Sequence, residues 1–199
     1  MKSVLLSIRP EWCEKIAKGE KTIEIRKNRP KLDTPFKVYI YMTAGDAVYP
    51  VTIDGAPYTC SNVGGKCVIG EFVCDEMTPL FNVATTSWSL LEGNVHEYAK
   101  GLVRMARLTE GEMHSYAKGK NCYAWHISDL VIYARCKKLT DFRVPCREYD
   151  KDRPQCGECE YYYYECNESV GFYDECGCGG TKHITRPPQS WCYVEEETP

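Results

Sequence analysis

The first residues of the chain alternate between apolar runs and charged positions, a pattern that predicts a strand and a short helix. Residues 3–8 form an apolar run typical of a buried strand. Pro10 suits the first turn of a helix, and Trp12 and Ile16 follow on one face at a spacing of four residues. Gly19 favours the left-handed turn that ends a helix, so we expect only about two helical turns.

The strand predicted after this turn alternates strictly between apolar and polar positions. Ile23 and Ile25 fall on one face, and Glu24 and Arg26 fall on the other. Because the isoleucines are expected to face the core, the two charged side chains share the opposite face. Lys21, at the turn before the strand, can reach the same side.

The rest of the chain adds short strands and two helical segments. We expect strands at residues 36–41, 67–74, 123–133 and 190–194, a hairpin or loop within 45–65, weak helical structure in 84–108 and a helix from the Thr109–Glu112 capping box to Gly119. Many short strands with few helices predict an α+β, mainly β fold, a small β-barrel with flanking short helices.

Charge is distributed unevenly along the chain. The net charge is −3, yet residues 1–40 hold ten Lys and Arg against five Asp and Glu, whereas residues 145–199 hold five against twelve. A basic N-terminal third suits a polyanionic ligand such as nucleic acid, although an ordinary solvated surface has the same composition. The apolar runs are too short for a membrane span or a signal peptide, which predicts a cytoplasmic protein.

Six of the thirteen cysteines are concentrated between residues 146 and 178. The odd total and the lack of a secretory signal favour reduced thiols over a disulfide framework. Cys156 and Cys159 form a C-x-x-C knuckle, and Cys176 with Cys178 follows in a polar segment that has few aliphatic residues. We expect a structural Zn²⁺ ion with its ligands drawn from Cys146, Cys156, Cys159, Cys176 and Cys178; free thiols in a loop are the alternative.

Two segments resemble the ASCH domain, a PUA-like fold, in its bacterial and phage form. They are SIRPEW at residues 7–12 and GEKTIEIR at residues 19–26, which contains the pattern G-x-K-x-x-E-x-R. The resemblance covers about residues 1–140 and extends to 186–199. It implies a barrel with a cleft between strands and helices, in a superfamily whose members mostly bind RNA or modified nucleosides.

The resemblance also implies an enzymatic alternative. Some small ASCH proteins are similar to amidohydrolases that deacetylate N4-acetylcytidine, with a lysine at the position of Lys21 and a carboxylate that matches Glu71. In this chain Glu24 stands where those enzymes have a threonine. A hydrolase, either of this amidohydrolase type or a ribonuclease, would use Lys21 and Glu71 as its catalytic residues.

The candidate ligand-binding residues are Lys21, Glu24, Arg26 and Tyr41. Arg26 can bind a phosphate or a base edge, Glu24 can accept from an amino group, and Tyr41 is the aromatic residue expected to line the cleft. A simple ion pair on the strand surface is the structural alternative. Trp12 and Trp125 are expected in the core, and His126 is expected to have a structural role.

The predicted organisation has three parts. Residues 1–144 form the ASCH domain, residues 145–185 form a Cys-rich zinc-knuckle insertion, and residues 186–199 return a final strand to the barrel. We expect RNA or a modified nucleoside as the ligand. A third possibility is a non-catalytic regulatory module whose acidic, zinc-binding arm contacts a protein partner.

Overall fold

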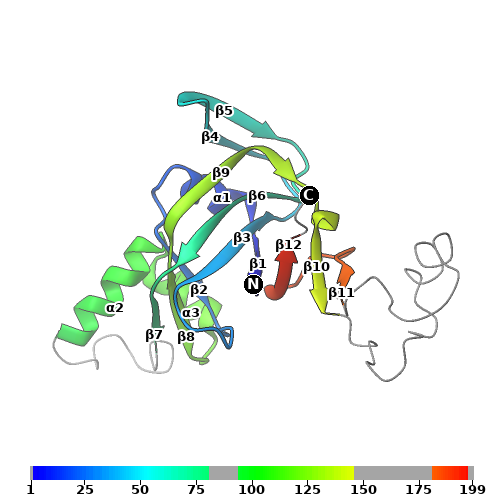
Figure 1. The fold of residues 1–199 in the computed structure, drawn as a ribbon. Helices are drawn as coiled ribbons and strands as arrows, with labels where there is room; N and C mark the ends of the chain where they lie inside the picture. Colours follow the sequence, from blue (N-terminus) through cyan, green and yellow to red (C-terminus); the bar gives the residue numbers. More distant parts are fainter. Residues whose placement is uncertain (1, 81–93, 146–180, 197–199) are drawn as a thin grey trace, which may run out of the picture.

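The computed structural model describes residues 2–80, 94–145 and 181–196, and Figure 1 shows their arrangement. The largest sheet has seven strands in the order β11-β10-β12-β1-β3-β6-β9. Its members are β1 (Ser3–Ile8), β3 (Phe36–Met42), β6 (Cys67–Cys74), β9 (Ser128–Lys137), β10 (Phe142–Pro145), β11 (Thr181–His183) and β12 (Trp191–Glu196).

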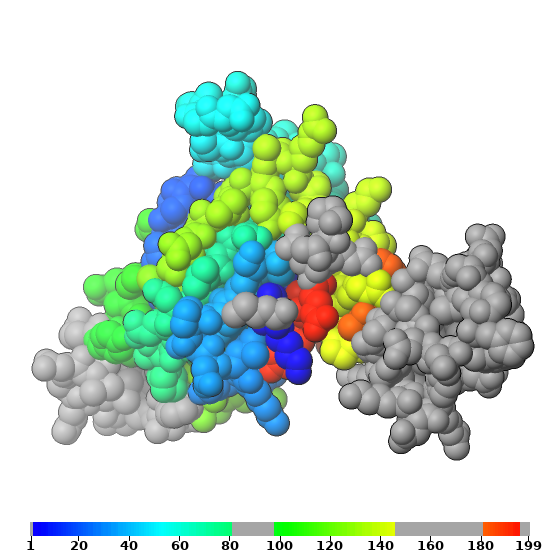
Figure 2. Space-filling model, in the orientation of Figure 1, coloured from blue at the N-terminus to red at the C-terminus, as the bar shows by residue number. Residues whose placement is uncertain are grey.

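Two smaller sheets complete the β structure of the described residues. One has the order β2-β8-β7 and consists of β2 (Ile23–Arg26), β7 (Met77–Leu80) and β8 (Cys122–His126). The other is a hairpin of β4 (Ala47–Ile53) and β5 (Ala56–Asn62), which stands out from the rest of the surface in Figure 2. The mainly β fold with short helices is confirmed. The described strands form open sheets, so closure into a barrel stays a prediction.

The α-helices lie beside the small three-stranded sheet and at the end of β1, and a short 3₁₀ helix connects β9 to β10. These helices are α1 (Pro10–Ala17), α2 (Asn94–Met105), α3 (Glu110–Ala117) and the short 3₁₀ helix η2 (Leu139–Asp141). The predicted capping box is present, since the Thr109 side chain accepts from the Glu112 backbone N–H and the Glu112 side chain accepts from the Thr109 backbone N–H. Figure 1 places α2 and α3 at the β2-β8-β7 end, away from β10 and β11.

The hairpin forms where the turn signals predict it. Asp54 and Gly55 both have positive φ, 50° and 80°, and Ile53 pairs with Ala56. A two-residue turn with positive φ at both positions matches the twist of the strands that it joins.

The single strand expected at residues 123–133 is wrong. The chain divides there into β8 and β9, which belong to different sheets. The direction changes at Ile127, whose backbone N–H donates to Thr22, and Asp129 then has a φ of 45°. Apolar side chains continue across this corner because both strands are half-buried. The apolar pattern of the sequence therefore does not indicate that one strand ends and another begins here.

Among the described residues, three groups of buried side chains form the core. One fills the space between the seven-stranded sheet and α1, a second packs α2 and α3 against Ile23 and Ile25, and the third lies on the other face of β1 and β3. Ile23 and Ile25 are 3% and 4% exposed, which confirms the predicted core face of β2. Glu24 and Arg26 therefore lie on the face of β2 that points away from this core.

The C-terminal strand closes the fold beside the first strand. β12 pairs antiparallel with β1, with Leu6 opposite Trp191, while β1 and β3 run parallel. The strand expected at residues 190–194 is present as β12. The division into three parts remains a prediction, since the proposed insertion falls mostly on residues outside the described ranges.

Candidate functional site

The turn between α1 and β2 brings Lys21 next to the strand. α1 begins at Pro10 and continues to Ala17. Gly19 then adopts a φ of 71°, and the backbone N–H of Lys21 donates to the Lys15 carbonyl. This tight reversal turns the Lys21 side chain back toward the face of β2 that carries Glu24.

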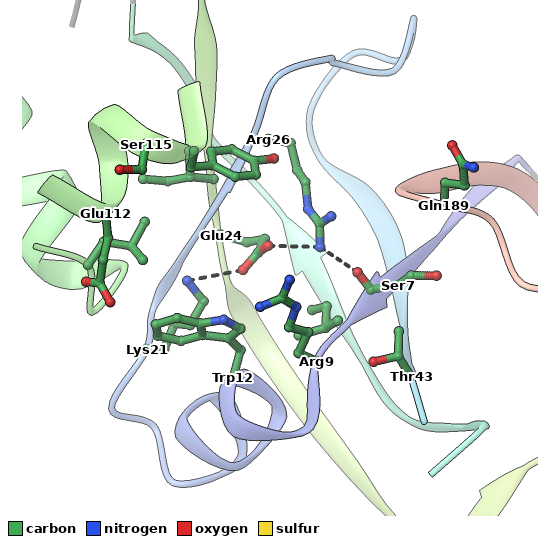
Figure 3. Close-up of a pocket in the computed structure, with 14 residues that line it drawn as sticks. Ser7, Arg9, Trp12, Lys21, Glu24, Arg26, Thr43, Glu112, Ser115 and Gln189 are labelled. Atoms are coloured by element: carbon green, nitrogen blue, oxygen red, sulfur yellow. Dashed lines mark hydrogen bonds and ion pairs between the residues drawn. The ribbon is translucent and has the colours of Figure 1, made fainter. Parts of the chain in front are cut away.

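Lys21, Glu24 and Arg26 form one buried ion network. Lys21 Nζ lies 3.1 Å from Glu24 Oε2, and Arg26 Nη2 lies 2.9 Å from Glu24 Oε1, as the dashed lines in Figure 3 show. The side chains are 3%, 9% and 12% exposed, respectively. Two cations on one carboxylate leave a net charge of +1. A buried network of this kind differs from the exposed surface ion pair that was the structural alternative.

The two cations also tie β2 to distant parts of the chain. Lys21 Nζ donates to the Ala106 carbonyl at 2.8 Å, just beyond α2. Arg26 Nη2 donates to the Ser7 carbonyl at 2.7 Å, and Arg26 Nη1 lies 3.5 Å from Ser190 Oγ. Among the described residues, Arg26 Nε is buried and has no hydrogen-bond partner. The guanidinium therefore keeps an unused donor.

The network forms the floor of a cleft with a volume of about 540 Å³. The walls come from the end of β1, from α1, from β2, from Thr43 after β3, from α3 and from Gln189 before β12. A volume of this size is typical of small-molecule and nucleotide sites. The structure thus places Lys21, Glu24 and Arg26 together in one cleft, as the strand alternation predicts.

Trp12 packs against the core, as expected, and also lines this cleft. Its indole is partly exposed, with Lys15 Nζ 4.5 Å and Lys21 Nζ 5.2 Å from the ring centroid. Trp125 is fully buried, as expected, beside Phe36 and Trp191. Trp12 lies on the apolar face of α1, as the helical spacing predicts. The edge of its large indole extends past this face and borders the cleft.

Tyr41 does not line the cleft. Its side chain is 3% exposed and packs on the other face of β3, in the cluster that contains Leu5, Phe142 and Val194. Burial raises the pKa of its phenol. The expectation that Tyr41 contacts the ligand is wrong because both faces of β3 are covered, so an aromatic residue there is buried whichever way it points.

Glu71 is also absent from the cleft lining. Its Oε1 lies 2.8 Å from Lys37 Nζ, and its Oε2 accepts a short hydrogen bond from the Tyr133 hydroxyl. Glu71 pairs with Tyr39 across the strands, on the face of the sheet that carries Tyr41. The structure therefore does not bring Lys21 and Glu71 together as a catalytic pair.

The wall formed by α3 was missed from the sequence. Glu112, Ser115 and Tyr116 line the cleft from this helix. Burial raises the pKa of the Tyr116 phenol, and the nearby Arg26 partly opposes this shift. The backbone N–H of Thr109 holds the pKa of Glu112 below its usual value. The capping box located the helix, but nothing in the local pattern indicated that it faces β2.

His126 has a structural contact, as expected, with its Nδ1 2.7 Å from Asp75 Oδ1.

The five cysteines predicted to bind zinc, Cys146, Cys156, Cys159, Cys176 and Cys178, lie outside the described residues. Within the described ranges, no cluster of three or more His, Cys, Asp or Glu side chains has the geometry for a metal ion. No helix of that part of the chain is long and apolar enough to cross a membrane.

Comparison with known proteins agrees with this fold. Residues 6–93 match the family model of the ASCH domain. The crystal structure of ASCH from Zymomonas mobilis superposes with a TM-score of 0.50 at 19% identity, covering 97% of this chain and 87% of that one. A single-substitution variant of the same protein gives a TM-score of 0.50 at 19% identity, covering 98% and 91%.

No curated protein matches the chain in sequence. At these identities the solved structures establish the fold alone, and the family model supplies the link to a sequence family. The model match includes α1, β2 and the whole Lys21–Glu24–Arg26 network. Residues 6–93 therefore match the ASCH domain, a PUA-like family, and the solved ASCH structures share the fold of the chain.

Proposed function

We propose that the cleft binds RNA, or a modified nucleoside, through the positive charge on its floor. RNA binding is the general property of ASCH domains. The observation that carries the proposal is the buried Lys21–Glu24–Arg26 network, with its net charge of +1, at the bottom of a cleft of about 540 Å³. A fixed cation in a partly dehydrated cleft attracts a phosphate far more strongly than the same cation in bulk water.

The three residues have different roles in this proposal. Lys21 is 3% exposed and already bonded to Glu24 and to the Ala106 carbonyl, so it supplies charge and position rather than a direct contact. Glu24 holds both cations in place. Arg26 keeps unused donor capacity at Nε and contacts Ser190 only at 3.5 Å, so its guanidinium is the group that can turn toward a ligand.

Two further side chains at the cleft support nucleotide binding. Arg9 lines the cleft and its side chain is 77% exposed, which suits a mobile contact to a phosphate. The partly exposed Trp12 indole offers an aromatic surface of the kind on which unpaired bases stack. A base and its phosphate would thus have separate contacts in the same cleft.

The test is binding of fluorescein-labelled single-stranded RNA octamers, followed by anisotropy at several salt concentrations. We expect Arg9→Ala and Arg26→Ala each to weaken binding about tenfold at low salt and to reduce the salt slope by about 0.7 for each phosphate that the variant no longer neutralises. Arg135→Ala is the matched control, because Arg135 is exposed on β9 and does not line the cleft.

The Arg9→Ala variant should fold normally, since among the described residues the exposed Arg9 side chain has a single charged contact, with Glu11 at 3.9 Å. A nucleoside panel measured by calorimetry, including acetylated cytidine, covers the modified-nucleoside form of the proposal. The proposal is overturned if the wild-type protein binds neither RNA nor any nucleoside of the panel. It also fails if Arg135→Ala weakens binding as much as Arg9→Ala.

The hydrolase alternative has no geometric support, since Glu71 is not among the residues that line the cleft with Lys21. It makes a separate prediction, that wild-type protein releases acetate from an acetylated nucleoside or cuts RNA, and that Lys21→Ala abolishes this turnover. The absence of both activities across the panel would remove this alternative. A regulatory module with a protein partner predicts instead that neither ligand binding nor turnover is found.

A further inference from the structure

The cleft contains polar side chains of two kinds, those already bonded to the protein and those without a partner. The side chains that are already bonded include those of the Lys21–Glu24–Arg26 network, Ser7 and Glu112. Ser7 Oγ donates to the Pro188 carbonyl at 2.6 Å, and Glu112 Oε2 accepts from the Thr109 backbone N–H and hydroxyl, both at 2.8 Å. These groups must give up hydrogen bonds that they already make if they turn to a ligand.

Besides the Trp12 indole, which has a single N–H donor, four polar side chains of the cleft have no hydrogen bond to the protein within the described ranges. They are those of Arg9, Thr43, Ser115 and Gln189. Arg9 can only donate, and the two hydroxyls each present a single oxygen. The carboxamide of Gln189 alone presents a donor and an acceptor side by side, the arrangement that matches the adjacent donor and acceptor atoms on the edge of a nucleobase.

The backbone around Gln189 is held firmly although its side chain is exposed. On one side, the Pro188 carbonyl accepts from Ser7 Oγ, and the proline ring fixes φ. On the other side, the Ser190 carbonyl accepts from the Ser7 backbone N–H at 2.9 Å. A side chain between two anchored residues loses less entropy when it binds than one on a free loop.

The position of Gln189 relative to the charged side chains of Arg26 and Lys21 also suits contact with a base (Figure 3). Figure 3 shows it on the far side of Arg26 and Ser7 from Lys21 and Trp12. Its neighbour Ser190 lies 3.5 Å from Arg26 Nη1. The charged floor therefore lies between Trp12 and the free carboxamide, so Gln189 would contact a base on the other side of the phosphate from a base stacked on Trp12 (Figure 3).

We propose that Gln189 determines which base the cleft accepts, through paired hydrogen bonds from its carboxamide to the base edge. This inference rests on the proposed nucleotide-binding function and assigns the base specificity of that same site. Arg26 and Arg9 attract any nucleotide through its phosphate, whereas Gln189 distinguishes one base from another. The site thus takes an unpaired nucleotide whose base edge is accessible, because pairing in a duplex occupies that edge.

The experiment compares RNA octamers of adenine, cytosine and uracil by anisotropy, with wild-type protein, Gln189→Ala and Gln189→Glu. We expect Gln189→Ala to weaken binding of the preferred octamer about tenfold and to bring the three affinities to within about twofold of one another, with the salt slope unchanged. Gln189→Glu keeps the shape but removes the donor, so it should also abolish the preference. Thr185→Ala, an exposed position in the same segment, is the control.

The outcomes separate this inference from the proposed function. If no octamer binds to the wild-type protein, RNA binding itself fails. If the octamers bind and their affinity ratios stay the same in Gln189→Ala, or if the wild-type protein shows no preference, RNA binding stands and the role of Gln189 is overturned. Because Gln189 is exposed and lacks a described partner, the variant should unfold at the wild-type temperature, and this measurement confirms that it is folded.

Discussion

Arg26 Nη2 donates a hydrogen bond to Glu24 Oε1 at 2.9 Å, and the Glu24 side chain is 9% exposed. Lys21 approaches the other oxygen of the same carboxylate at 3.1 Å. Glu24 is therefore the only negative charge between two buried cations of the described network. Its removal leaves both cations without their counter-charge in a place from which water is largely excluded.

The first prediction concerns this carboxylate. Glu24→Gln should lower the free energy of unfolding by about 3–5 kcal/mol, the usual cost when one partner of a buried ion network is removed. Urea unfolding followed by circular dichroism measures the change. Glu11→Gln, at an exposed contact 3.9 Å long, should cost less than about 0.5 kcal/mol. A decrease under about 1 kcal/mol for Glu24→Gln would show that the network does not stabilise the fold.

The second prediction concerns the pair of Asp75 and His126. The hydrogen bond from His126 holds the pKa of Asp75 below its ordinary value of 3.8. Because the folded-state pKa is the lower one, the pair's contribution to stability is present above pH 3.8 and is lost as the pH falls through the folded-state value. Both side chains are substantially exposed, so the contribution should not exceed about 1 kcal/mol.

Asp75→Asn tests this dependence. The wild-type protein should be more stable than the variant at pH 6, and the difference should shrink as the pH is lowered toward about 2. Asp33→Asn, at an exposed position, serves as the control. A difference that stays constant over this range would mean that the hydrogen bond does not depend on the charge of Asp75.

The third prediction concerns the reactivity of the thiols. Burial raises the pKa of Cys74 to about 12, and its side chain has no exposed surface, whereas Cys136 is exposed on β9. Since the thiolate is the reactive form, iodoacetamide at pH 8 should label Cys136 at least about a hundredfold faster than Cys74. Peptide mass spectrometry over a time course measures both rates. In denaturant the two rates should become similar, and equal rates in the folded protein would contradict the described burial.

The fourth prediction concerns the cysteines between residues 146 and 178. We propose that ligands from Cys146, Cys156, Cys159, Cys176 and Cys178 bind one structural Zn²⁺ ion, as their number and spacing indicate. Purified protein should contain about one zinc per chain by elemental analysis, and a chelator should lower its melting temperature. Replacing Cys156 and Cys159 together with serine should remove the metal, while Cys136→Ser should not. Less than about half an equivalent of zinc would count against the site.

Local patterns predicted the elements close to the site well. Strict alternation in β2 placed Ile23 and Ile25 in the core and Glu24 with Arg26 on the other face, and the glycine turn put Lys21 beside them. These predictions succeeded because the period of a strand and the chirality of a turn depend on neighbouring residues only. The position of α3 as a wall of the cleft, and of Gln189 at its edge, had no such local signal.

The errors have a common physical cause. Tyr41 and Glu71 were assigned to the cleft from their residue types and from a family resemblance, yet both lie on the other face of the main sheet. Alternation along a strand shows that its two faces have different surroundings, but it does not show which face a ligand can reach. On β3 both faces are covered. The core position of Trp12 is confirmed only in part, since a core-facing helix can still leave the edge of a large side chain exposed.

The class of fold, the first helix and turn, and the grouping of Lys21, Glu24 and Arg26 follow from the local pattern of residues. The burial of these charges follows from tertiary packing, since it depends on Ala106, Ser7 and the segment before β12, which are far from β2 in the chain. Tertiary packing also places Gln189 at the same cleft. Contacts between residues so far apart depend on how the sheets and helices pack, and no local periodicity records that packing.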